Sequence, residues 1–435
     1  MKRFSCVIFA LWLVCGSLIQ AAASEVPEVE SKYVYVYNLD EHRILYEKNA
    51  HKKMYPASMT KMMTVLVALD QLKDKDMEEV ITFTPEMLKG LSEEGASVVG
   101  YSVGDQARII DLLYGILLPS GADASRAIAI HLTGSEKAFV AKMNEKAKEL
   151  KLENTHFVNT SGLHNDDHYS TAADMAKILE TGLKNATFEK IFTSESYEIG
   201  TAVDDTKVTL KPDLSLEGTT LYSTKLTLMK RAGLNKDIIK GSKTGYTLEG
   251  GLCMASIADH DNAHYLIITG QAGSDAATAQ NMKDAYTLYD YLFQNYERKL
   301  IYPKDKVISK ADLIYGKEDS VGIKPLDDIY LLVEKDNSDY KSSFQQSVTK
   351  APVAKGEVIG NMSVMYQGEQ RQKFNVVATK EVSWSLLAFL SYYLFDRFLI
   401  LPLILIIAIV IILMIRRRNI RRLQRRRAAR MMRNR

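Results

Sequence analysis

The spacing of apolar residues predicts strands and helices over the first two thirds of the chain. Residues 33–48 alternate apolar and polar side chains around a polar turn, which predicts two strands. Residues 58–72 are apolar on nearly every side, so the helix predicted there should be buried. The apolar runs 251–257 and 264–270 flank a polar turn and predict a hairpin. Further helices are expected at 108–118, 125–132, 135–150, 171–183 and 276–296.

The pattern changes after about residue 298. Short β-prone runs then alternate with polar turns as far as Thr379. We therefore expect residues 24–297 to form one domain and residues 298–382 to form a small all-β domain. Residues 383–396 are aromatic and apolar and are predicted to lie at a membrane interface. The β-prone runs are 306–308, 329–333, 358–365 and 373–377.

The N-terminal residues have the pattern of an export signal. Lys2 and Arg3 precede an apolar stretch, and Ala21-Ala22-Ala23 then offers a cleavage site of small residues. This pattern predicts a signal peptide over residues 1–23 and a mature chain on the extracytoplasmic side.

The C-terminal residues predict a membrane anchor. Phe398 to Ile415 is a run of eighteen uncharged residues, which as a helix would span ~27 Å, about one bilayer core. Arginine-rich sequence follows it, and the positive-inside rule assigns such sequence to the cytoplasm. We expect a single-pass transmembrane helix over 397–416 and a cytoplasmic tail over 417–435.

Charge is distributed unevenly along the chain. The formal net charge is +3, but residues 416–435 alone contribute eleven arginines and no acid. Residues 24–415 carry 43 basic and 53 acidic side chains, so the body is acidic. We therefore expect no nucleic-acid partner and assign the tail to anionic lipid, with nucleic acid as its alternative partner.

Cysteine usage excludes an internal disulfide in the mature chain. Cys6 and Cys15 would leave with the signal peptide, and only Cys253 remains. Cys15 is not expected to carry a lipid, because Val14 precedes it where that signal has a small residue. Cys253 is predicted to be a small buried apolar residue.

Three Ser-x-x-Lys tetrads occur, and their context separates them. Ser347–Lys350 and the tetrad from residue 338 to Lys341 lie in polar, strand-rich sequence, where a surface pair is the simpler interpretation. Ser58–Lys61 opens the buried apolar helix, where an i, i+3 spacing stacks the two side chains. Burial lowers the pKa of a lysine, so that its amine can take a proton from a nearby serine hydroxyl.

Two more short motifs follow at later positions. Ser120-Gly121 lies in a predicted loop between two apolar helices. Lys243-Thr244-Gly245, followed by Tyr246, comes just before the predicted hairpin. A glycine on an edge strand lets a substrate backbone approach, and Lys and Thr beside it can hold a carboxylate. Ser-x-x-Lys, Ser-x-x and Lys-Thr-Gly in this order are typical of penicillin-recognising serine enzymes.

The chain resembles the low-molecular-mass penicillin-binding D-alanyl-D-alanine carboxypeptidases. This resemblance implies an α/β fold of the β-lactamase and D,D-peptidase type, with an antiparallel sheet flanked by helices, then a small β domain and a C-terminal membrane segment. The segments that carry it are Leu45–Asn49, Pro56–Lys61, Asp111–Gly115, Leu118–Gly121, Gly134-Ser135, Phe139-Val140, Met143-Asn144, Thr155–Phe157, Ser161–His164 and Tyr169–Ala172.

The resemblance also implies a reaction and a role for each motif residue. The expected reaction removes the terminal D-alanine from peptidoglycan stem peptides, with β-lactam antibiotics as inhibitors and no cofactor or metal. Ser58 is expected to be the acylated nucleophile, Lys61 its general base and Ser120 a proton relay. Residues 243–245 would grip the substrate carboxylate, and the backbone N–H groups of Ser58 and Tyr246 would form an oxyanion hole.

One departure from the family keeps two alternatives open. The usual second motif is Ser-x-Asn, whereas this chain has Ala122 in the last position. The missing amide favours a slower enzyme or a non-catalytic wall-binding relative. A β-lactamase is the other alternative, but no Glu-x-x-x-Asn occurs between Ser125 and Ser242. His164 and His168 could suggest a metal site, but their segment is predicted to be a solvated loop.

Overall fold

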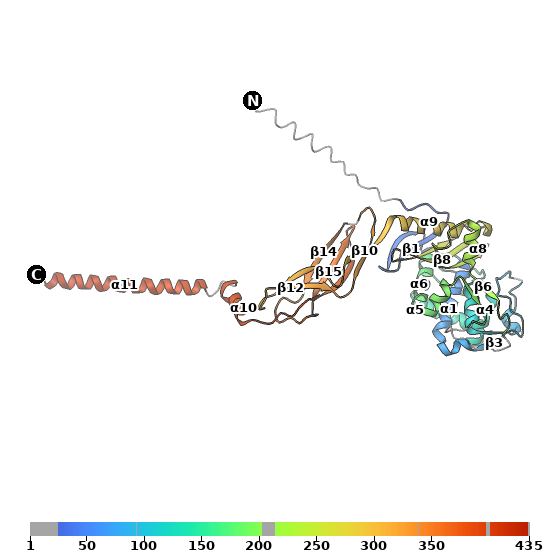
Figure 1. Ribbon diagram of the computed structural model, residues 1–435, viewed down its shortest axis with the longest axis horizontal. Helices are drawn as coiled ribbons and strands as arrows, with labels where there is room; N and C mark the ends of the chain where they lie inside the picture. Colours follow the sequence, from blue (N-terminus) through green and yellow to red (C-terminus); the bar gives the residue numbers. More distant parts are fainter. Residues whose placement is uncertain (1–24, 93, 202–213, 338, 397–400, 434–435) are drawn as a thin grey trace, which may run out of the picture. The chain divides into compact units, whose positions relative to one another are not determined.

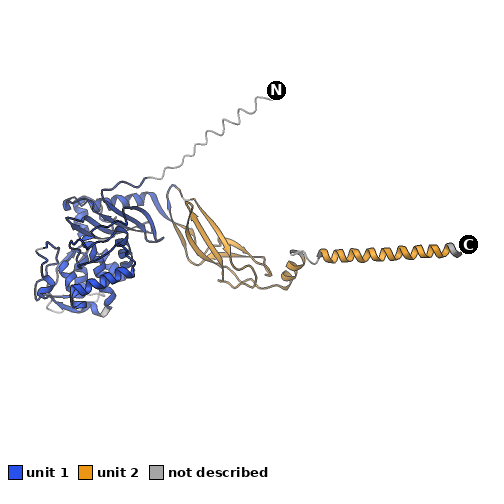
Figure 2. Ribbon diagram, turned by 180° about the vertical axis from the view of Figure 1, so that it is seen from behind, with its two compact units in different colours: residues 1–298, 332–336 blue, residues 299–331, 337–435 orange. Residues whose placement is uncertain are grey.

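The computed structural model describes residues 25–92, 94–201, 214–337, 339–396 and 401–433. The chain divides into two compact units, which Figure 2 shows in different colours. The first unit contains residues 1–298 with 332–336, and the second contains 299–331 with 337–435. The predicted signal peptide, residues 1–23, lies outside the described residues.

The first unit is built on a five-stranded antiparallel sheet with the order β2-β1-β9-β8-β7 (Figure 1). Asp261 and Asn262 connect β8 to β9. Both have a positive φ, as a two-residue hairpin turn that matches the twist of its strands requires. Both the predicted hairpin and the predicted strand pair at 33–48 are confirmed. The strands are β1 (Tyr33–Asn38), β2 (Arg43–Lys48), β7 (Gly241–Thr247), β8 (Gly251–His260) and β9 (Ala263–Gly270).

Helices cover both faces of this sheet. Successive side chains of a strand point to opposite sides, and the apolar side chains on both sides are buried against helices. On β8, Met254 and Ala258 pack in one cluster with Met282 of α9 (Gln280–Asn295). Cys253 and Ile257 belong to a second cluster on the other face, shared with the remaining helices. Cys253 is buried and free, as the sequence predicted.

The helical part surrounds α1 (Thr60–Gln71), which is buried along nearly its whole length, as predicted. Helices α3, α4, α5 and α6 all pack against α1. The predicted helices are confirmed with boundaries shifted by up to four residues. Their bounds are α3 (Ile109–Leu117), α4 (Ala122–Thr133), α5 (Glu136–Glu149) and α6 (Ala172–Gly182).

Several shorter elements complete the first unit, and no pattern in the sequence predicted them. Two of these helices, α7 (Ala186–Thr193) and α8 (Thr224–Ala232), pack against β7. The others are η1 (Ala57–Met59), η2 (Asp74–Glu78), β3 (Val80–Thr82), α2 (Pro85–Leu88), β4 (Gln106–Arg108), β5 (Ser196–Glu198), β6 (Thr220–Tyr222) and η3 (Ala276–Thr278).

The second unit has a β domain at its centre. Its five-stranded sheet has the order β11-β12-β16-β15-β14, and an apolar core that includes Ile323 and Val376 packs on it. The predicted strand at 306–308 is wrong, because Lys306 closes a turn onto Pro303 there. The chain crosses the boundary between the units in β10 (Tyr296–Tyr302) and β13 (Ile329–Glu334). The sheet strands are β11 (Ser309–Asp312), β12 (Ser320–Pro325), β14 (Tyr340–Gln346), β15 (Val358–Tyr366) and β16 (Glu369–Ala378).

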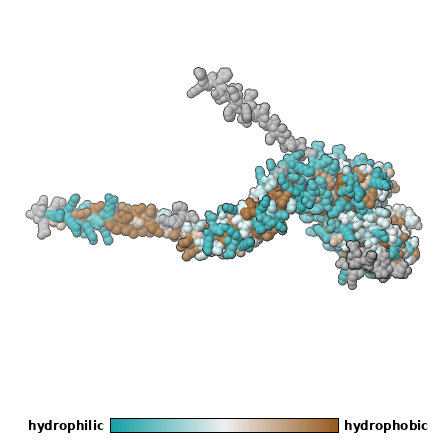
Figure 3. All heavy atoms as spheres, viewed as in Figure 1, coloured by the Kyte–Doolittle hydropathy of each residue, from teal (hydrophilic) through white to brown (hydrophobic). Residues whose placement is uncertain are grey.

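The C-terminal helix corrects the predicted fold. Among the residues that the structure describes, no helix combines the length and the unbroken apolar run that a membrane crossing needs. Helix α11 (Leu401–Arg433) has an apolar first part and is rich in arginine from Arg416 on, while residues 397–400 of the predicted span lie outside the described residues. Figure 3 shows this apolar stretch followed by hydrophilic residues. The expected transmembrane helix over 397–416 is therefore wrong on the described residues.

The segment predicted to be interfacial contains a short helix, α10 (Leu386–Ser391), which continues as a π-helical turn, η4 (Tyr392–Asp396). Leu387 is 80% exposed and Trp384 is 43% exposed. The role of residues 383–396 stays a prediction.

Candidate active site

Ser58 and Lys61 lie at the junction of η1 and α1. Ala57 has a φ of 46°, a left-handed conformation that costs energy for a residue with a side chain. This turn leads straight into α1, so that the Lys61 Nζ comes within 3.0 Å of the Ser58 Oγ. The same Nζ donates to the backbone carbonyl of Ser161 at 2.7 Å. The predicted i, i+3 pairing is therefore present, with a third partner that the motif did not indicate.

Burial governs the protonation of Lys61. Its side chain is 2% exposed. Burial lowers the pKa of Lys61 to about 7, although the charge of Asp123 opposes this shift. A large fraction of Lys61 is therefore neutral near pH 7, and a neutral amine beside a hydroxyl can accept its proton.

Ser120 occupies the turn between α3 and α4. It has a φ of 71° and its side chain is buried, with 5% exposed. Among the described residues its Oγ has no hydrogen-bond partner. A strained backbone and an unpaired buried hydroxyl in one residue are typical of a functional side chain that forms its hydrogen bond only when a substrate is bound.

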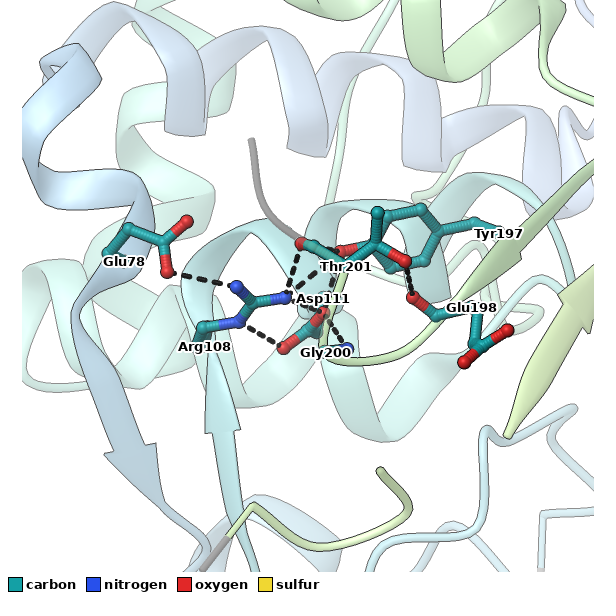
Figure 4. Close-up of polar contacts among 7 residues, drawn as sticks. All are labelled: Glu78, Arg108, Asp111, Tyr197, Glu198, Gly200 and Thr201. Carbon is teal, nitrogen blue, oxygen red and sulfur yellow. Dashed lines mark hydrogen bonds and ion pairs between the residues drawn. The ribbon is translucent and has the colours of Figure 1, made fainter. Parts of the chain in front are cut away.

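A buried ion-pair network fixes the start of α3, the helix that leads to Ser120 (Figure 4). Arg108 donates two hydrogen bonds of 2.8 Å to the buried carboxylate of Asp111 and one of 2.9 Å to Glu78. Tyr197 also donates to Asp111, at 2.7 Å. Burial, together with the Asp111 charge, raises the pKa of Tyr197, so the phenol keeps its proton. The network therefore anchors the helix without taking part in the cleft.

Strand β7 carries the third motif past Ser58. A Cβ atom on Gly245 would lie 2.9 Å from the backbone nitrogen of Ser58, so only glycine allows the strand to come this close. The Thr244 hydroxyl is 2.8 Å from the hydroxyl of Thr224, the first residue of α8. Tyr246 is 39% exposed, and its phenol donates to the Ser274 carbonyl.

Lys243 is fully buried, and Lys61 is nearly so. The Lys243 Nζ donates to the carbonyl of Thr244 at 2.9 Å. Burial, and then the nearby charge of Lys61, lower the pKa of Lys243 well below its usual value. Because alternate residues of a strand share a face, Lys243 lies on the same side of β7 as Gly245, the side next to Ser58.

These elements enclose a cleft of about 480 Å³. Arg231 of α8 lines it and also donates to the carbonyl of Ala276 at 3.2 Å. Sequence reasoning missed this residue because no pattern predicted α8. The described side chains around the cleft that can form hydrogen bonds include Ser58, Ser97, Ser120, Thr224, Arg231 and Thr244.

The segment that follows α5 packs against η1. A Cβ atom on Gly162 would lie 1.8 Å from the carbonyl oxygen of Ala57, which explains why glycine stands there. The Nδ1 atom of His168 accepts a hydrogen bond from the backbone N–H of Val158. Its Nε2 atom therefore carries the proton and donates it to the Thr60 hydroxyl at 2.8 Å. Burial lowers the pKa of His168 to about 3, which keeps the ring neutral.

The predicted solvated loop at 164–168 is only half right. His168 is buried, whereas His164 is partly exposed and contacts the ring of Tyr55 edge-on. Within the described residues, no group of His, Cys, Asp and Glu is arranged to hold a metal ion.

Two family descriptions match this chain, one for each part. Residues 20–272, more than half of the chain, match the S11 peptidases, described as D-alanyl-D-alanine carboxypeptidases. Residues 296–383 match the C-terminal domain of penicillin-binding protein 5.

Individual relatives agree with these matches. The D-alanyl-D-alanine carboxypeptidase DacF of Bacillus subtilis is 32% identical over 81% of this chain and 86% of its own length. The carboxypeptidase DacA of Escherichia coli is 25% identical over 85% of this chain and 90% of its own.

Solved structures share the fold. Penicillin-binding protein 5 from Haemophilus influenzae aligns with a TM-score of 0.62 at 23% identity, covering 82% of this chain and 98% of that one. A peptidoglycan synthesis regulatory factor from Streptococcus pneumoniae aligns with a TM-score of 0.66 at 22% identity, covering 82% of this chain and all of that one. The chain belongs to the S11 peptidase family and is a serine-type D-alanyl-D-alanine carboxypeptidase.

Proposed function

We propose that this enzyme removes the terminal D-alanine of peptidoglycan stem pentapeptides through an acyl-enzyme on Ser58. The observation that carries the assignment is the 3.0 Å contact between the buried Lys61 Nζ and the Ser58 Oγ. Neutral Lys61 takes the proton of Ser58, and the freed oxygen attacks the carbonyl carbon of the penultimate D-alanine. Ser120, with its unpartnered hydroxyl, passes a proton to the leaving amine.

The transition state and the substrate need two further groups of donors. We assign the oxyanion to the backbone N–H groups of Ser58 and Tyr246, where one donor is worth about 3–4 kcal/mol in a known protease. The Thr244 hydroxyl, which can accept from Thr224, would donate to the terminal carboxylate. Arg231 adds positive charge from the cleft wall.

Deacylation uses the same groups in reverse, with water in place of the leaving amine. None of the described residues that line the cleft is an aspartate or glutamate. A bound β-lactam keeps its cleaved ring in the site, so water would have no dedicated carboxylate base there. This favours β-lactams as slow-leaving inhibitors over the β-lactamase alternative.

The test of the proposed function is direct. Full-length enzyme should release D-alanine from a peptide ending in D-Ala-D-Ala and should gain the mass of one β-lactam, on the peptide that contains Ser58. A chain that binds peptidoglycan but does neither would be the wall-binding relative that Ala122 favours.

We also propose that the catalytic domain works on the extracytoplasmic side, because its substrate is there. A β-lactam that does not enter the cytoplasm should label the enzyme in intact cells. Labelling only after lysis would contradict this location.

The acidic limb of the pH profile should report Lys61. Because burial lowers the pKa of Lys61 to about 7, the reactive neutral form grows as the pH rises through that value. The acylation rate should therefore fall roughly 100-fold from its plateau to pH 5. Rates of β-lactam acylation measured from pH 5 to 9 test this, and a flat profile would remove Lys61 as the base.

Arg231→Ala should weaken substrate binding more than the chemical step. A charge-assisted hydrogen bond is worth about 1.5–3 kcal/mol, so kcat/KM should fall roughly 10- to 100-fold, mainly through KM. Lys230→Ala is the matched control, because Lys230 is an exposed cation on the same helix. Equal losses in the two variants would mean that only the general charge of α8 matters.

A further inference from the structure

One wall of the cleft is an irregular segment, Gly95–Tyr101, that is held by hydrogen bonds to the start of α4. The carboxylate of Asp123, 1% exposed, accepts from the backbone nitrogens of Val99 and Gly100 at 2.9 Å and of Tyr101 at 3.3 Å. In the opposite direction, the backbone nitrogen of Ala122 donates to the Ser97 carbonyl at 2.8 Å. The segment is therefore clasped at four points by two consecutive residues of α4.

Tight packing supports the same segment. A Cβ atom on Gly121 would lie 2.6 Å from the Val99 Cγ2, and one on Gly115 would lie 2.8 Å from it. The ring of Tyr101 stacks on Phe83 at 4.4 Å between centroids. The side chain of Val99 thus fits against two glycines, which limits how far the segment can shift.

These hydrogen bonds and contacts place Ser97 at the cleft. Gly95 and Ser97 line the cleft together with Ser58 and Ser120, and of the two only Ser97 has a side chain that can form hydrogen bonds. Ala122, whose nitrogen bonds Ser97, is 1% exposed and offers only a methyl group. On the wall formed by Gly95 and Ser97 beside Ala122, the hydroxyl therefore comes from Ser97.

On the basis of the proposed acyl-transfer function, we propose that Ser97 binds a peptide group of the substrate and that Asp123 is the positioning residue that holds Ser97 in the cleft. A serine hydroxyl can both donate and accept, so it can bond either the N–H or the C=O of a substrate backbone. The hydroxyl would supply the contact that a methyl group at position 122 cannot make.

Asp123 also has a second, separable effect. Its negative charge raises the pKa of Lys61 against the effect of burial. Replacing Asp123 by asparagine should therefore shift the acidic limb of the pH profile to lower pH, whereas a change in Ser97 should leave it in place. The pH profile distinguishes a local change of the segment from loss of the charge.

The experiment measures kcat and KM of full-length enzyme with a D-Ala-D-Ala peptide. Ser97→Ala should lower kcat/KM roughly 3- to 10-fold, mainly through KM, as expected for one neutral hydrogen bond. Ser102→Ala, an exposed serine just beyond the segment, is the matched control and should match wild type. Asp123→Asn should cause a similar or larger loss and shift the pH limb downward.

Non-additivity then tests whether Asp123 acts through Ser97. The Ser97→Ala and Asp123→Asn losses in kcat/KM should combine to less than their product, because both remove the same contact. Val99→Ala loosens the seat without changing a charge, so it should lower kcat/KM with no shift in the pH limb. It replaces Asp123→Asn if a thermal melt shows that the latter does not fold.

Clear results would overturn the proposal. Equal kinetics of Ser97→Ala, Ser102→Ala and wild type would show that Ser97 does not bind substrate. Fully additive losses for the double variant would remove Asp123 as its positioning residue. A wild-type enzyme without any turnover would instead contradict the proposed function. The role of Ser97 would then be decided by comparing the rates at which a β-lactam acylates Ser97→Ala and Ser102→Ala.

Discussion

Replacing Ser58 by alanine is expected to abolish both D-alanine release and labelling by β-lactams. Its Oγ is the hydroxyl that the buried Lys61 amine contacts at 3.0 Å. Removal of the nucleophile lowers kcat about 10⁶-fold in a well-studied serine protease, and a loss of that order is expected here. Release of D-alanine and the mass of the protein after β-lactam treatment measure the two effects.

The chain contains its own control for this change. Ser347 belongs to a second Ser-x-x-Lys tetrad, but it lies in the β domain, where its hydroxyl donates to the Ile359 carbonyl at 2.9 Å. Ser347→Ala should retain full activity. Normal turnover by a folded Ser58→Ala protein would contradict the acyl-enzyme on Ser58.

Replacing Lys61 by arginine or methionine is expected to block acylation, with a loss of roughly 10²- to 10⁴-fold in rate. A guanidinium keeps its proton at any pH that the protein survives, and methionine has no basic group. The two variants lose the base for different chemical reasons. Lys61 is 2% exposed, and the two replacements differ in size and charge, so that if one disturbs the fold the other provides the test. Burst kinetics with a chromogenic β-lactam measure the acylation step directly.

Lys350→Arg, in the tetrad of Ser347, serves as the control and should behave like wild type. Thermal melts of both Lys61 variants separate loss of folding from loss of chemistry. Acylation by folded Lys61→Arg at more than a trace of the wild-type rate would transfer the role of base to another group.

Patterns with a short range in the chain predicted most of the elements. The period-2 alternation at 33–48 and the all-round apolar run at 58–72 each depend on neighbouring residues, and both elements formed as expected. Elements without such a pattern were missed. Helix α8 has apolar and polar residues in no clear period, and its buried Met229 packs in the cluster on the α9 side of the sheet.

The C-terminal helix illustrates a limit of counting residues. The sequence has eighteen uncharged residues up to Ile415, and their number predicted a membrane span. Among the described residues, no helix is long and apolar enough to cross a membrane, so the count alone did not establish a span.

By itself, the sequence determined the reaction class, because the order of the three motifs and the i, i+3 spacing of Ser58 and Lys61 are local properties of the chain. The tertiary structure alone decided how these motifs meet. Close packing buries Lys243 and brings Arg231 and Ser97 to the cleft, from segments far apart in the chain. Burial also sets the pKa of Lys61, because desolvation depends on the surrounding fold and not on the neighbouring residues.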